Sequence, residues 1–542
     1  MADFSNKVIY QIYPKSFKDS NGDGIGDLRG VAEKLDYLKD LGVDYLWLTP
    51  FFVSPQRDNG YDVADYRNID PMFGTMEDLD NLIAEGEKRN IGLMFDMVFN
   101  HTSTSHEWFR RALAGEKKYQ DYYIFKEGAP DQPPTNWQSK FGGSAWEYVS
   151  SLGKWYLHLF DVTQADLNWK NPEVREELKE VIRFWKAKGV KGFRFDEIWE
   201  DDFEGDGRKF YTDGPYVHEY LKELVRDTGI EDYVTVGEMS STTLEHCIRY
   251  SGAEEKELSM CFNFHHLKVD YKDGNKWELM EPDYMELKVI FEKWQMGMQR
   301  GNAWNALFWC NHDQPRIVSR FGNEGEYWKE SAKMLAGMIH LMRGTPYIYQ
   351  GEEIGMTNPH YTSIEQYADV ESRNYYEILL NEGKTKEEAL EILAARSRDN
   401  SRTPMQWTDE RYCGFSDTKP WIPVSDNFEK INVKKQKQDR DSILEFYKKL
   451  IMLRKEKEVI ARGNIEFMEV ENAGVLAYTR CLDKQKLLVC CNFRDVESQM
   501  EFTQEWKSGR KILGNYEENH KNNYKVLTLR PYEIIVLEKG EE

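Results

Sequence analysis

The strongest constraint on the fold is a rhythm in the first 460 residues, where short runs rich in β-branched and aromatic residues alternate with longer stretches of helical period. Each run ends on polar or charged residues. The eight runs are Val8–Tyr13, Val43–Thr49, Ile91–Phe99, Val190–Asp196, Tyr233–Glu238, Met260–Phe264, Ala306–Asp313 and Thr345–Glu352. Segments such as Leu28–Leu41, Pro172–Lys188 and Tyr216–Arg226 are predicted helices. Eight strands with crossover helices predict a (β/α)₈ TIM barrel, whose active-site face is formed by the carboxyl ends of its strands.

Two segments depart from this rhythm. Residues 101–170 are rich in Trp, Tyr, Gly and Pro without a strong period, which predicts an inserted subdomain after strand three. Residues 462–542 show alternating, strand-like patterns and no helical stretch, which predicts a C-terminal all-β sandwich. The barrel would then be built from residues 1–100 and 171–461.

Composition limits the partners. Lys plus Arg is 72 and Asp plus Glu is 94, a formal charge of −22, which argues against a general nucleic-acid binder because phosphate backbones would be repelled. We see no signal peptide and no apolar window of about 18 residues, so we expect a cytoplasmic protein without membrane association. Its seven cysteines show no CxxC pairing and are expected to be reduced thiols. No interface signature appears; we expect a monomer and leave a weak dimer open.

Four strand ends carry acidic or imidazole groups: DMVFNH (96–101), GFRFDE (192–197), TVGEMS (235–240) and FWCNHDQPR (308–316). On a barrel these ends converge, which would bring Asp196, Glu238 and Asp313 together. Glycosidic cleavage needs one carboxylate nucleophile and one carboxylic acid that protonates the leaving oxygen. Arg194 lies two positions before Asp196, on the same side of the strand, and would keep that aspartate ionised. Singly, each motif is weak, because an acidic residue at a strand end is more often a loop cap.

The order and spacing of these blocks, with QADLN (164–168), resemble the α-amylase-type glycoside hydrolase family over essentially the whole chain. The resemblance implies that Asp196 is the nucleophile, Glu238 the general acid/base and Asp313 the transition-state stabiliser. It implies retention of anomeric configuration through a covalent intermediate on Asp196. By the same resemblance, the residues that line the subsite of the cleaved glucose are Tyr61, Asp62, His101, Phe160, Arg194, His312 and Arg402.

Further motifs narrow the branch. NGYD (59–62), YQGEEIGM (349–356) and SRDNSRTPMQW (397–407) resemble oligo-1,6-glucosidases and their relatives. The segments that resemble trehalose-6-phosphate hydrolases are FYTDGP (210–215), GEMSSTTLEHCIRY (237–250), FNFHHLKVDYKDGNKW (262–277) and NAWNALFWCNHDQPR (302–316). The implied activity is hydrolysis of α,α-trehalose 6-phosphate, a small sugar phosphate, to glucose and glucose 6-phosphate, without a catalytic cofactor.

A phosphorylated substrate needs positive charge, because a sugar phosphate is a dianion near neutral pH. His265, Lys268 and, more weakly, Lys276 are the candidate phosphate ligands; the alternative is a loop with solvated lysines. Two other functions stay open. One is an oligo-1,6-glucosidase acting on neutral isomalto-oligosaccharides, against which the cationic residues argue. The other is a non-catalytic, transporter-associated member of the fold, against which the retained carboxylates argue.

The loop after the first strand, DSNGDGIGD (19–27), places oxygen ligands at alternate positions. It is similar to an EF-hand loop, but Gly30 stands where the bidentate glutamate would be. The corresponding loop of relatives holds a structural Ca²⁺, so the resemblance implies a calcium site. Its ligands would be Asp19, Asn21, Asp23, the Ile25 carbonyl and Asp27. The alternative is an Asx-turn without metal.

One segment departs from the family pattern. Asp196 is followed directly by EIWEDD (197–202). Compared with the family pattern, several residues are missing from this stretch, which shapes the leaving-group side of the site. A true deletion and a gap closed over in the sequence are the two alternatives, and the residue after the nucleophile normally helps to select the linkage.

Overall fold

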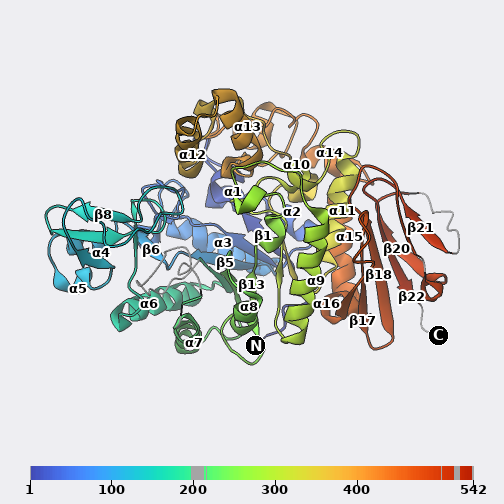
Figure 1. The fold of residues 1–542 in the computed structure, drawn as a ribbon, viewed down its shortest axis with the longest axis horizontal. Coiled ribbons are helices and arrows are strands. Elements are labelled where there is room, and N and C mark those ends of the chain that lie inside the picture. The colour runs from blue at the N-terminus through green and yellow to red at the C-terminus, as the bar shows by residue number, and fades with distance from the viewer. Residues whose placement is uncertain (1, 197–212, 215, 502, 518–524, 540–542) are drawn as a thin grey trace.

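The computed structural model describes residues 2–196, 213–214, 216–501, 503–517 and 525–539. The segment after Asp196 lies outside these residues. Figure 1 shows three parts in a row, with the barrel in the middle, residues of the inserted segment at one end and the C-terminal strands at the other.

The barrel contains a strand from each of the eight predicted runs. Its strands are β1 (Ile9–Ile12), β2 (Tyr45–Leu48), β5 (Gly92–Met97), β11 (Gly192–Phe195), β12 (Val234–Glu238), β13 (Met260–Phe262), β14 (Ala306–Leu307) and β15 (Thr345–Tyr349). Neighbours pair in parallel in chain order, and β15 pairs with both β14 and β1. A parallel bridge between Cys261 and Asn305 closes the circle. The prediction of a TIM barrel is confirmed.

Helices surround the strands. They are α1 (Leu28–Glu33), α2 (Leu35–Leu41), α3 (Met76–Lys88), α6 (Pro172–Lys188), α7 (Val217–Thr228), α8 (Leu244–Ser251), α9 (Tyr284–Arg300), α10 (Ile317–Phe321), α11 (Trp328–His340), α14 (Val433–Gln438), α15 (Ile443–Glu456) and α16 (Glu458–Arg462). The start of α6 follows from local chemistry, because Asn171 accepts a hydrogen bond from the Glu173 amide and Pro172 occupies the first turn. The predicted helix Leu28–Leu41 is in fact two, because the backbone leaves helical geometry at Lys34 (φ −101°, ψ 4°).

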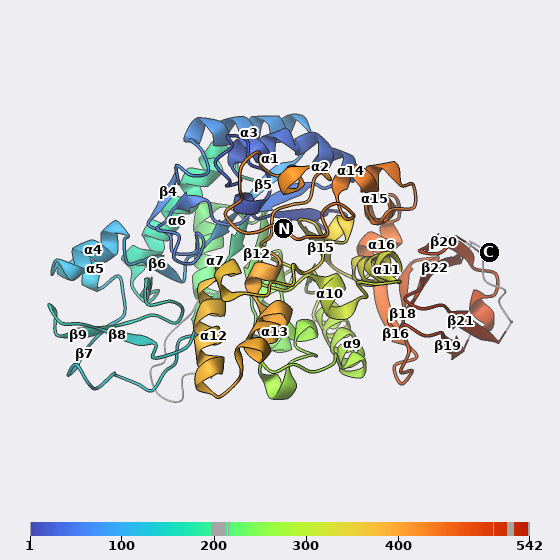
Figure 2. The ribbon, with the colours of Figure 1, turned by 90° about the horizontal axis from the view of Figure 1, so that it is seen from above.

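The inserted segment has its own small core. It contains β6 (His101–Ser103), α4 (Glu107–Leu113), α5 (Lys117–Gln120), β7 (Phe125–Glu127), β8 (Trp146–Val149), β9 (Lys154–Leu157) and β10 (Gln164–Asp166). Trp137, Trp146, Trp155 and Leu157 pack together within it. The antiparallel pairing of β6 with β10 ties the segment's two ends to each other, and Figure 2 shows it beside the barrel. His101, the first residue of β6, and Phe160, which lies between β9 and β10, both line the pocket at the barrel mouth.

Two further elements lie over the carboxyl ends of the strands. The short pair β3 (Phe52–Val53) and β4 (Asp65–Ile69) follows β2. A helical hairpin, α12 (Val370–Asn381) and α13 (Lys386–Arg396), stands above the barrel in Figure 1. The sequence reasoning did not anticipate this hairpin, and it contributes to the site described below.

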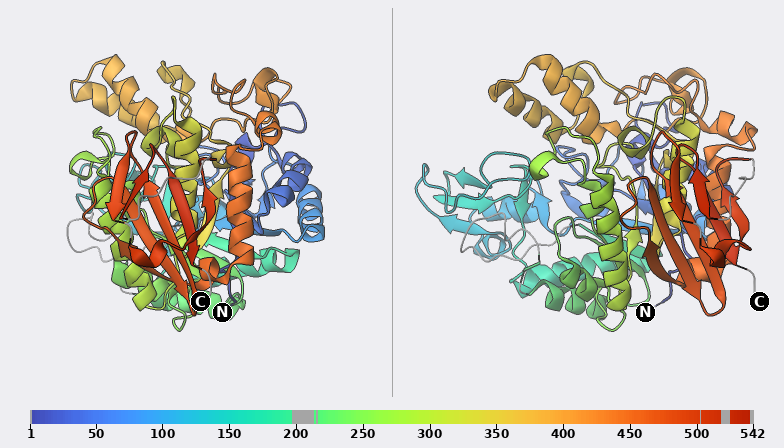
Figure 3. Two further views of the ribbon diagram at one scale, coloured as in Figure 1. Left: turned by 90° about the vertical axis from the view of Figure 1, so that its right-hand side faces the viewer. Right: turned by 45° about the vertical axis from the view of Figure 1, so that its right-hand side comes forward.

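The C-terminal strands form two sheets. One has the order β16 (Asn464–Met468), β17 (Val475–Leu482), β18 (Gln485–Asn492), β22 (Ile534–Lys539), β20 (Arg510–Gly514); the other pairs β19 (Ser498–Glu501) with β21 (Val526–Leu529). Apolar residues of both, including Leu488, Met500 and Leu527, make one buried cluster, so the all-β prediction is confirmed. A three-residue 3₁₀ turn, Gln504–Trp506, corrects the expectation of no helical stretch. Figure 3 shows the larger sheet beside the barrel. The two are joined where the Tyr478 hydroxyl donates to the Met338 carbonyl.

His340, at the end of α11, predicts a local pH effect on stability. It is 3% exposed, and burial, aided by Arg454, lowers its pKa from 6.5 to about 3. Between pH 6.5 and about pH 3, His340 is therefore protonated in the unfolded chain and neutral in the native state. Stability from this site is complete above pH 6.5 and falls as the pH drops towards 3. Relative to His340→Phe, the native protein should lose up to about 1.4 kcal/mol per pH unit below pH 6. Urea unfolding at several pH values checks this; parallel curves for the two proteins would contradict it.

Candidate functional site

A pocket of about 180 Å³ opens at the carboxyl ends of the barrel strands. Its lining includes Asp196, Glu238 and Asp313, so the three carboxylates predicted to converge do lie around one cavity. Asp196 directly follows β11, and its amide donates to the Met97 carbonyl of β5. Glu238 is the last residue of β12.

Arg194 joins two of these carboxylates. Its Nη1 lies 2.7 Å from Asp196 Oδ1 and 2.6 Å from Asp96 Oδ1, and its Nη2 contacts the Glu238 carboxylate. The guanidinium is 1% exposed. Burial acts to lower the pKa of Arg194, but the charges of Asp96 and Asp196 outweigh it and raise the pKa. The arrangement holds a permanent positive charge against Asp196, as the sequence predicted.

Asp313 has a different set of partners. His312 Nε2 lies 3.1 Å from its Oδ2, and Arg402 Nη2 donates to its Oδ1 over 2.6 Å. Burial by itself raises the pKa of Asp313, but His312, Arg398 and Arg402 outweigh it and hold the pKa well below the ordinary value. Asp313 therefore remains ionised at neutral pH.

Aromatic rings form one wall. Tyr61 stacks on His312 with ring centroids 5.1 Å apart and an interplanar angle of 3°, and its hydroxyl donates to Asp96 Oδ2 over 2.8 Å. Phe160 lines the pocket and lies 5.1 Å from the ring of His101. Burial lowers the pKa of His101 to about 4, so its ring is neutral at pH 7. Neutral hydrogen-bonding and flat apolar groups suit sugar recognition.

The three predicted phosphate ligands lie in different surroundings. Lys276 lines the pocket, where its Nζ is 2.7 Å from Glu371 Oε2 of α12. Lys268 donates from Nζ to the Ser240 carbonyl over 2.9 Å, and Ser240 belongs to the pocket lining. His265 begins the short 3₁₀ helix His265–Leu267 outside the lining, with its ring 4.6 Å from that of Trp294. The pocket therefore contains one of the three, and a second touches its wall.

The model of the α-amylase catalytic domain matches residues 11–463. The chain belongs to the α-amylase family. A second model, the C-terminal domain of maltogenic amylases, matches residues 465–536. These matches confirm the resemblance that the strand-end motifs carried, and they make this family member a glycoside hydrolase.

Individual relatives cover the whole chain. A trehalose-6-phosphate hydrolase of Escherichia coli is 52% identical over 548 residues, which is 98% of each chain. An oligo-1,6-glucosidase of Bacillus cereus is 45% identical over 551 residues, again 98% of each chain. The crystal structure of a trehalose-6-phosphate hydrolase of Bacillus licheniformis matches with a TM-score of 0.94 at 51% identity, covering 99% of this chain and 100% of that one.

One acidic residue predicted for the sugar site, Asp62, lies outside the pocket lining. Asp62 is fully buried and accepts hydrogen bonds from the Ser54 hydroxyl and the Arg57 and Asp58 amides, so it holds the loop and does not line the pocket. Asp58 lines the pocket instead, 3.0 Å from Arg398 Nη2. Burial, opposed by Arg398 and Arg402, raises the pKa of Asp58 to about 7. Both aspartates flank the same Asn-Gly turn (DNGYD), and the motif alone does not say which one faces the cavity.

Other pocket residues were also missed as contributors. Arg398, Glu371 and Gln314 line the pocket, together with Lys140. Arg398 belongs to the SRDNSRTPMQW motif, which was a usable signal. Glu371 had none, because its pairing with Lys276 joins residues 95 positions apart.

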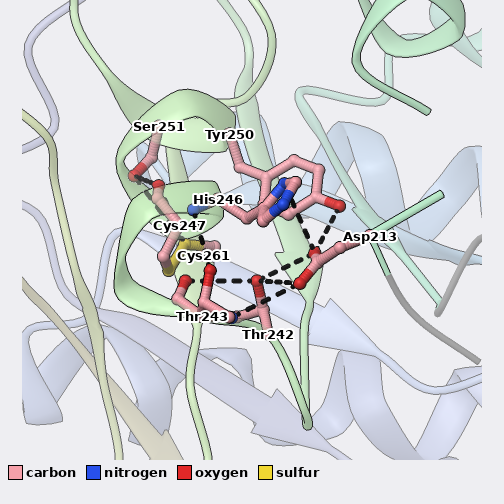
Figure 4. The surroundings of a disulfide bond; sticks show 8 residues. All are labelled: Asp213, Thr242, Thr243, His246, Cys247, Tyr250, Ser251 and Cys261. Atoms are coloured by element: carbon pink, nitrogen blue, oxygen red, sulfur yellow. Dashed lines mark hydrogen bonds and ion pairs between the residues drawn. A yellow bond between two sulfur atoms is a disulfide. The ribbon is translucent and has the colours of Figure 1, made fainter. Parts of the chain in front are cut away.

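The cysteine prediction was wrong for one pair. Cys247 of α8 and Cys261 of β13 form a disulfide, and the other five cysteines are free. Figure 4 shows Asp213 on the other side of Thr242 from this bridge, where it accepts hydrogen bonds from the Thr242 and Tyr250 hydroxyls. The bridge thus fastens the helix that follows Glu238 to the next strand.

The predicted calcium loop hydrogen-bonds to itself. Asp19 accepts from the amides of Asn21, Gly22 and Gly24 and from the Ser416 hydroxyl. Asp27 caps α1 by accepting from the Gly30 amide. Within the described residues, no group of three or more His, Cys, Asp or Glu side chains is placed to hold a metal. The predicted ligand set also includes Asn21 and the Ile25 carbonyl, and calcium binding by this loop stays a prediction.

Asp19→Ala should destabilise the protein by about 2–4 kcal/mol, because several buried donors lose their acceptor. Urea unfolding measures the loss, and Asp23→Ala, whose carboxylate accepts from the Ile25 amide at an exposed position, should cost less. Repeating both with Ca²⁺ and with a chelator tests the metal. A melting temperature of the native protein that rises with Ca²⁺ would support a calcium site in this loop. A melting temperature that does not change with Ca²⁺ would contradict one.

Proposed function

We propose that this glycoside hydrolase cleaves α,α-trehalose 6-phosphate to glucose and glucose 6-phosphate. The observation that carries the proposal is a lysine, Lys276, in the wall of the pocket that also holds Asp196, Glu238 and Asp313. Relatives at 51–52% identity over the full chain carry the name trehalose-6-phosphate hydrolase, which supports the same substrate.

In the proposed reaction, the unphosphorylated glucose lies against Tyr61 and Phe160. Asp196 attacks its anomeric carbon while Glu238 gives a proton to the bridging oxygen, so that the carbon–oxygen bond breaks and glucose 6-phosphate leaves. A β-glucosyl ester on Asp196 remains. Glu238, now a carboxylate, takes a proton from water, whose oxygen attacks the same carbon and releases glucose with the α configuration.

The remaining charged groups fit supporting roles. Asp313 would accept hydrogen bonds from sugar hydroxyls, since it is held ionised by His312 and Arg402. Arg194 favours the carboxylate form of Asp196 before attack. No step draws on a metal, because every proton and electron pair is supplied by these residues and water.

Lys276 would bind the phosphate of the leaving sugar. Its ammonium faces the cavity beside Glu371, and Lys140 and Arg398 add positive charge to the same lining. Arg398 is itself paired with Asp58 and Asp369, so the charge offered to a dianion in this part of the pocket comes from Lys276 and Lys140. Lys268, whose Nζ donates to the Ser240 carbonyl, and His265 remain candidates for indirect contacts with the phosphate.

Product analysis tests the proposal directly. Incubation with trehalose 6-phosphate, followed by ¹H and ³¹P NMR, should show one glucose and one glucose 6-phosphate per substrate consumed, with α-glucose appearing first. Initial β-glucose would contradict the retaining mechanism. Release of inorganic phosphate instead would mean that a phosphate ester, and not a glycosidic bond, is broken.

Localisation and assembly stay predictions. No helix in the described part of the chain combines the length and the apolar character that a membrane crossing requires. We propose a cytoplasmic monomer, supported by the sequence features given above; light scattering on the purified protein would test the second part.

A further inference from the structure

A second cavity, of about 250 Å³, lies at the opposite end of the barrel from the carboxylates. Its lining residues precede strands: Ser5 comes before β1, Ser259 before β13, Trp304 before β14 and Arg343 before β15. In a parallel barrel these positions lie at the amino ends of the strands, far from the catalytic face. Polar groups at this end take no part in the proposed hydrolysis.

Arg343 is the unusual member of this lining. It is 8% exposed, and its Nη1 donates to the Ala303 carbonyl over 2.7 Å. Within the described residues, no carboxylate lies within salt-bridge distance of it and no acceptor meets its Nε or Nη2. Its guanidinium lies over the ring of Trp304, 4.6 Å from the centroid. Burial lowers the pKa of Arg343 to about 10, so the group is still charged at neutral pH.

Two other buried arginines nearby show how this fold usually satisfies such a group. Arg454 donates to four backbone carbonyls, those of Ser5, Gly344, His340 and Met342. Arg480 donates to the carbonyls of Leu341 and Gly463. Arg343 has only one such bond. In the described part of the chain, no atom of Arg343 is both fully buried and unpartnered, so its Nε and Nη2 donors face the cavity and are open to a ligand there.

Other groups of the lining would also suit an anionic partner. The Ser5 hydroxyl is buried without a hydrogen-bond partner among the described residues. Arg462 lies at the same cavity in an ion pair with Asp3, 2.7 Å away. The charged members of the lining therefore carry a net +1 in a chain of net charge −22.

We propose that this cavity binds a small oxyanion, with the phosphate group as its recognised part. The guanidinium of Arg343 provides the paired donors that suit a planar pair of anionic oxygens, and the Ser5 hydroxyl adds a third donor. The indole of Trp304 offers a flat surface to the organic group of a phosphate monoester. The ligand is either the free phosphate ion or a phosphate monoester. The relative affinities for inorganic phosphate and for glucose 6-phosphate distinguish the two.

Titration calorimetry with inorganic phosphate and with glucose 6-phosphate tests the proposal. Lys276→Met weakens phosphate binding in the catalytic pocket, so in this background the part of the remaining binding that depends on Arg343 reports the second cavity. In the Lys276→Met background, Arg343→Gln should weaken that binding at least tenfold, while Arg300→Gln, an exposed arginine at the end of α9, should leave it unchanged. Tighter binding of glucose 6-phosphate identifies a monoester site, and equal binding identifies a free-ion site.

Two results would overturn the proposal. One is the absence of binding in the Lys276→Met protein; the other is equal affinity with and without Arg343. If Arg343→Gln does not fold, the native protein provides the answer, because selenate soaked into its crystals is visible by anomalous scattering. A peak within hydrogen-bond distance of Arg343 is expected, and an empty cavity at saturating selenate would contradict the site.

Discussion

Replacing Asp196 with Asn should lower kcat by about 10⁴-fold or more on every glucoside tested, because the covalent step loses its nucleophile. The substitution is nearly isosteric, and Arg194 retains Asp96 and Glu238 as partners, so the fold should persist. The loss should appear in kcat and not mainly in KM, since the sugar contacts of Tyr61 and Phe160 stay in place.

The matched control is Asp131→Asn, which changes an exposed aspartate of the inserted segment outside the pocket and should leave kcat unaltered. Circular dichroism establishes that both variants are folded. Mass spectrometry of the native enzyme after quenching with a slow 2-fluoro-glucoside should find the sugar on Asp196. Residual activity within tenfold of the native value, or a label on another residue, would contradict the assignment.

Replacing Lys276 with Met should lower kcat/KM for trehalose 6-phosphate by about 10²–10³-fold, the cost of removing one partner from a buried, charge-assisted contact. A neutral aryl α-glucoside should lose less than about threefold. Part of the loss arises because Glu371, 2.7 Å from Nζ in the native protein, would be left facing the phosphate with its negative charge uncompensated.

Lys272→Met is the matched control, because it removes an exposed lysine from the same loop. It should change neither substrate's kcat/KM appreciably. Lys268→Met should have an intermediate effect, since Nζ reaches only the wall of the pocket. Equal losses of kcat/KM for the charged and the neutral substrate in Lys276→Met would show that Lys276 shapes the pocket. No loss for either substrate would mean that other residues bind the phosphate.

The sequence predicted the barrel well because both of its signals are local. Each buried strand is a short apolar run, and polar residues at its carboxyl end must meet on one face once eight strands close. That logic brought Asp196, Glu238 and Asp313 around one pocket without any knowledge of their distances.

The misses share a physical cause, which is that they depend on partners distant in sequence or on the path of one loop. Asp58 and Asp62 flank one Asn-Gly turn, and only the folded loop decides which faces the cavity. Cys247 and Cys261 pair because α8 lies against β13, while seven cysteines without a motif leave pairing undetermined. The Lys276–Glu371 contact depends on a helical hairpin that no strand-end pattern announces.

The central claim is that this pocket selects a phosphorylated disaccharide. Its most direct test is kcat/KM of the purified protein for trehalose 6-phosphate, measured beside trehalose and isomaltose under the same conditions. We expect the phosphorylated sugar to be preferred by at least about 10²-fold, the value of one well-placed charge-assisted contact. A higher kcat/KM for isomaltose would contradict the account and would make the chain an oligo-1,6-glucosidase.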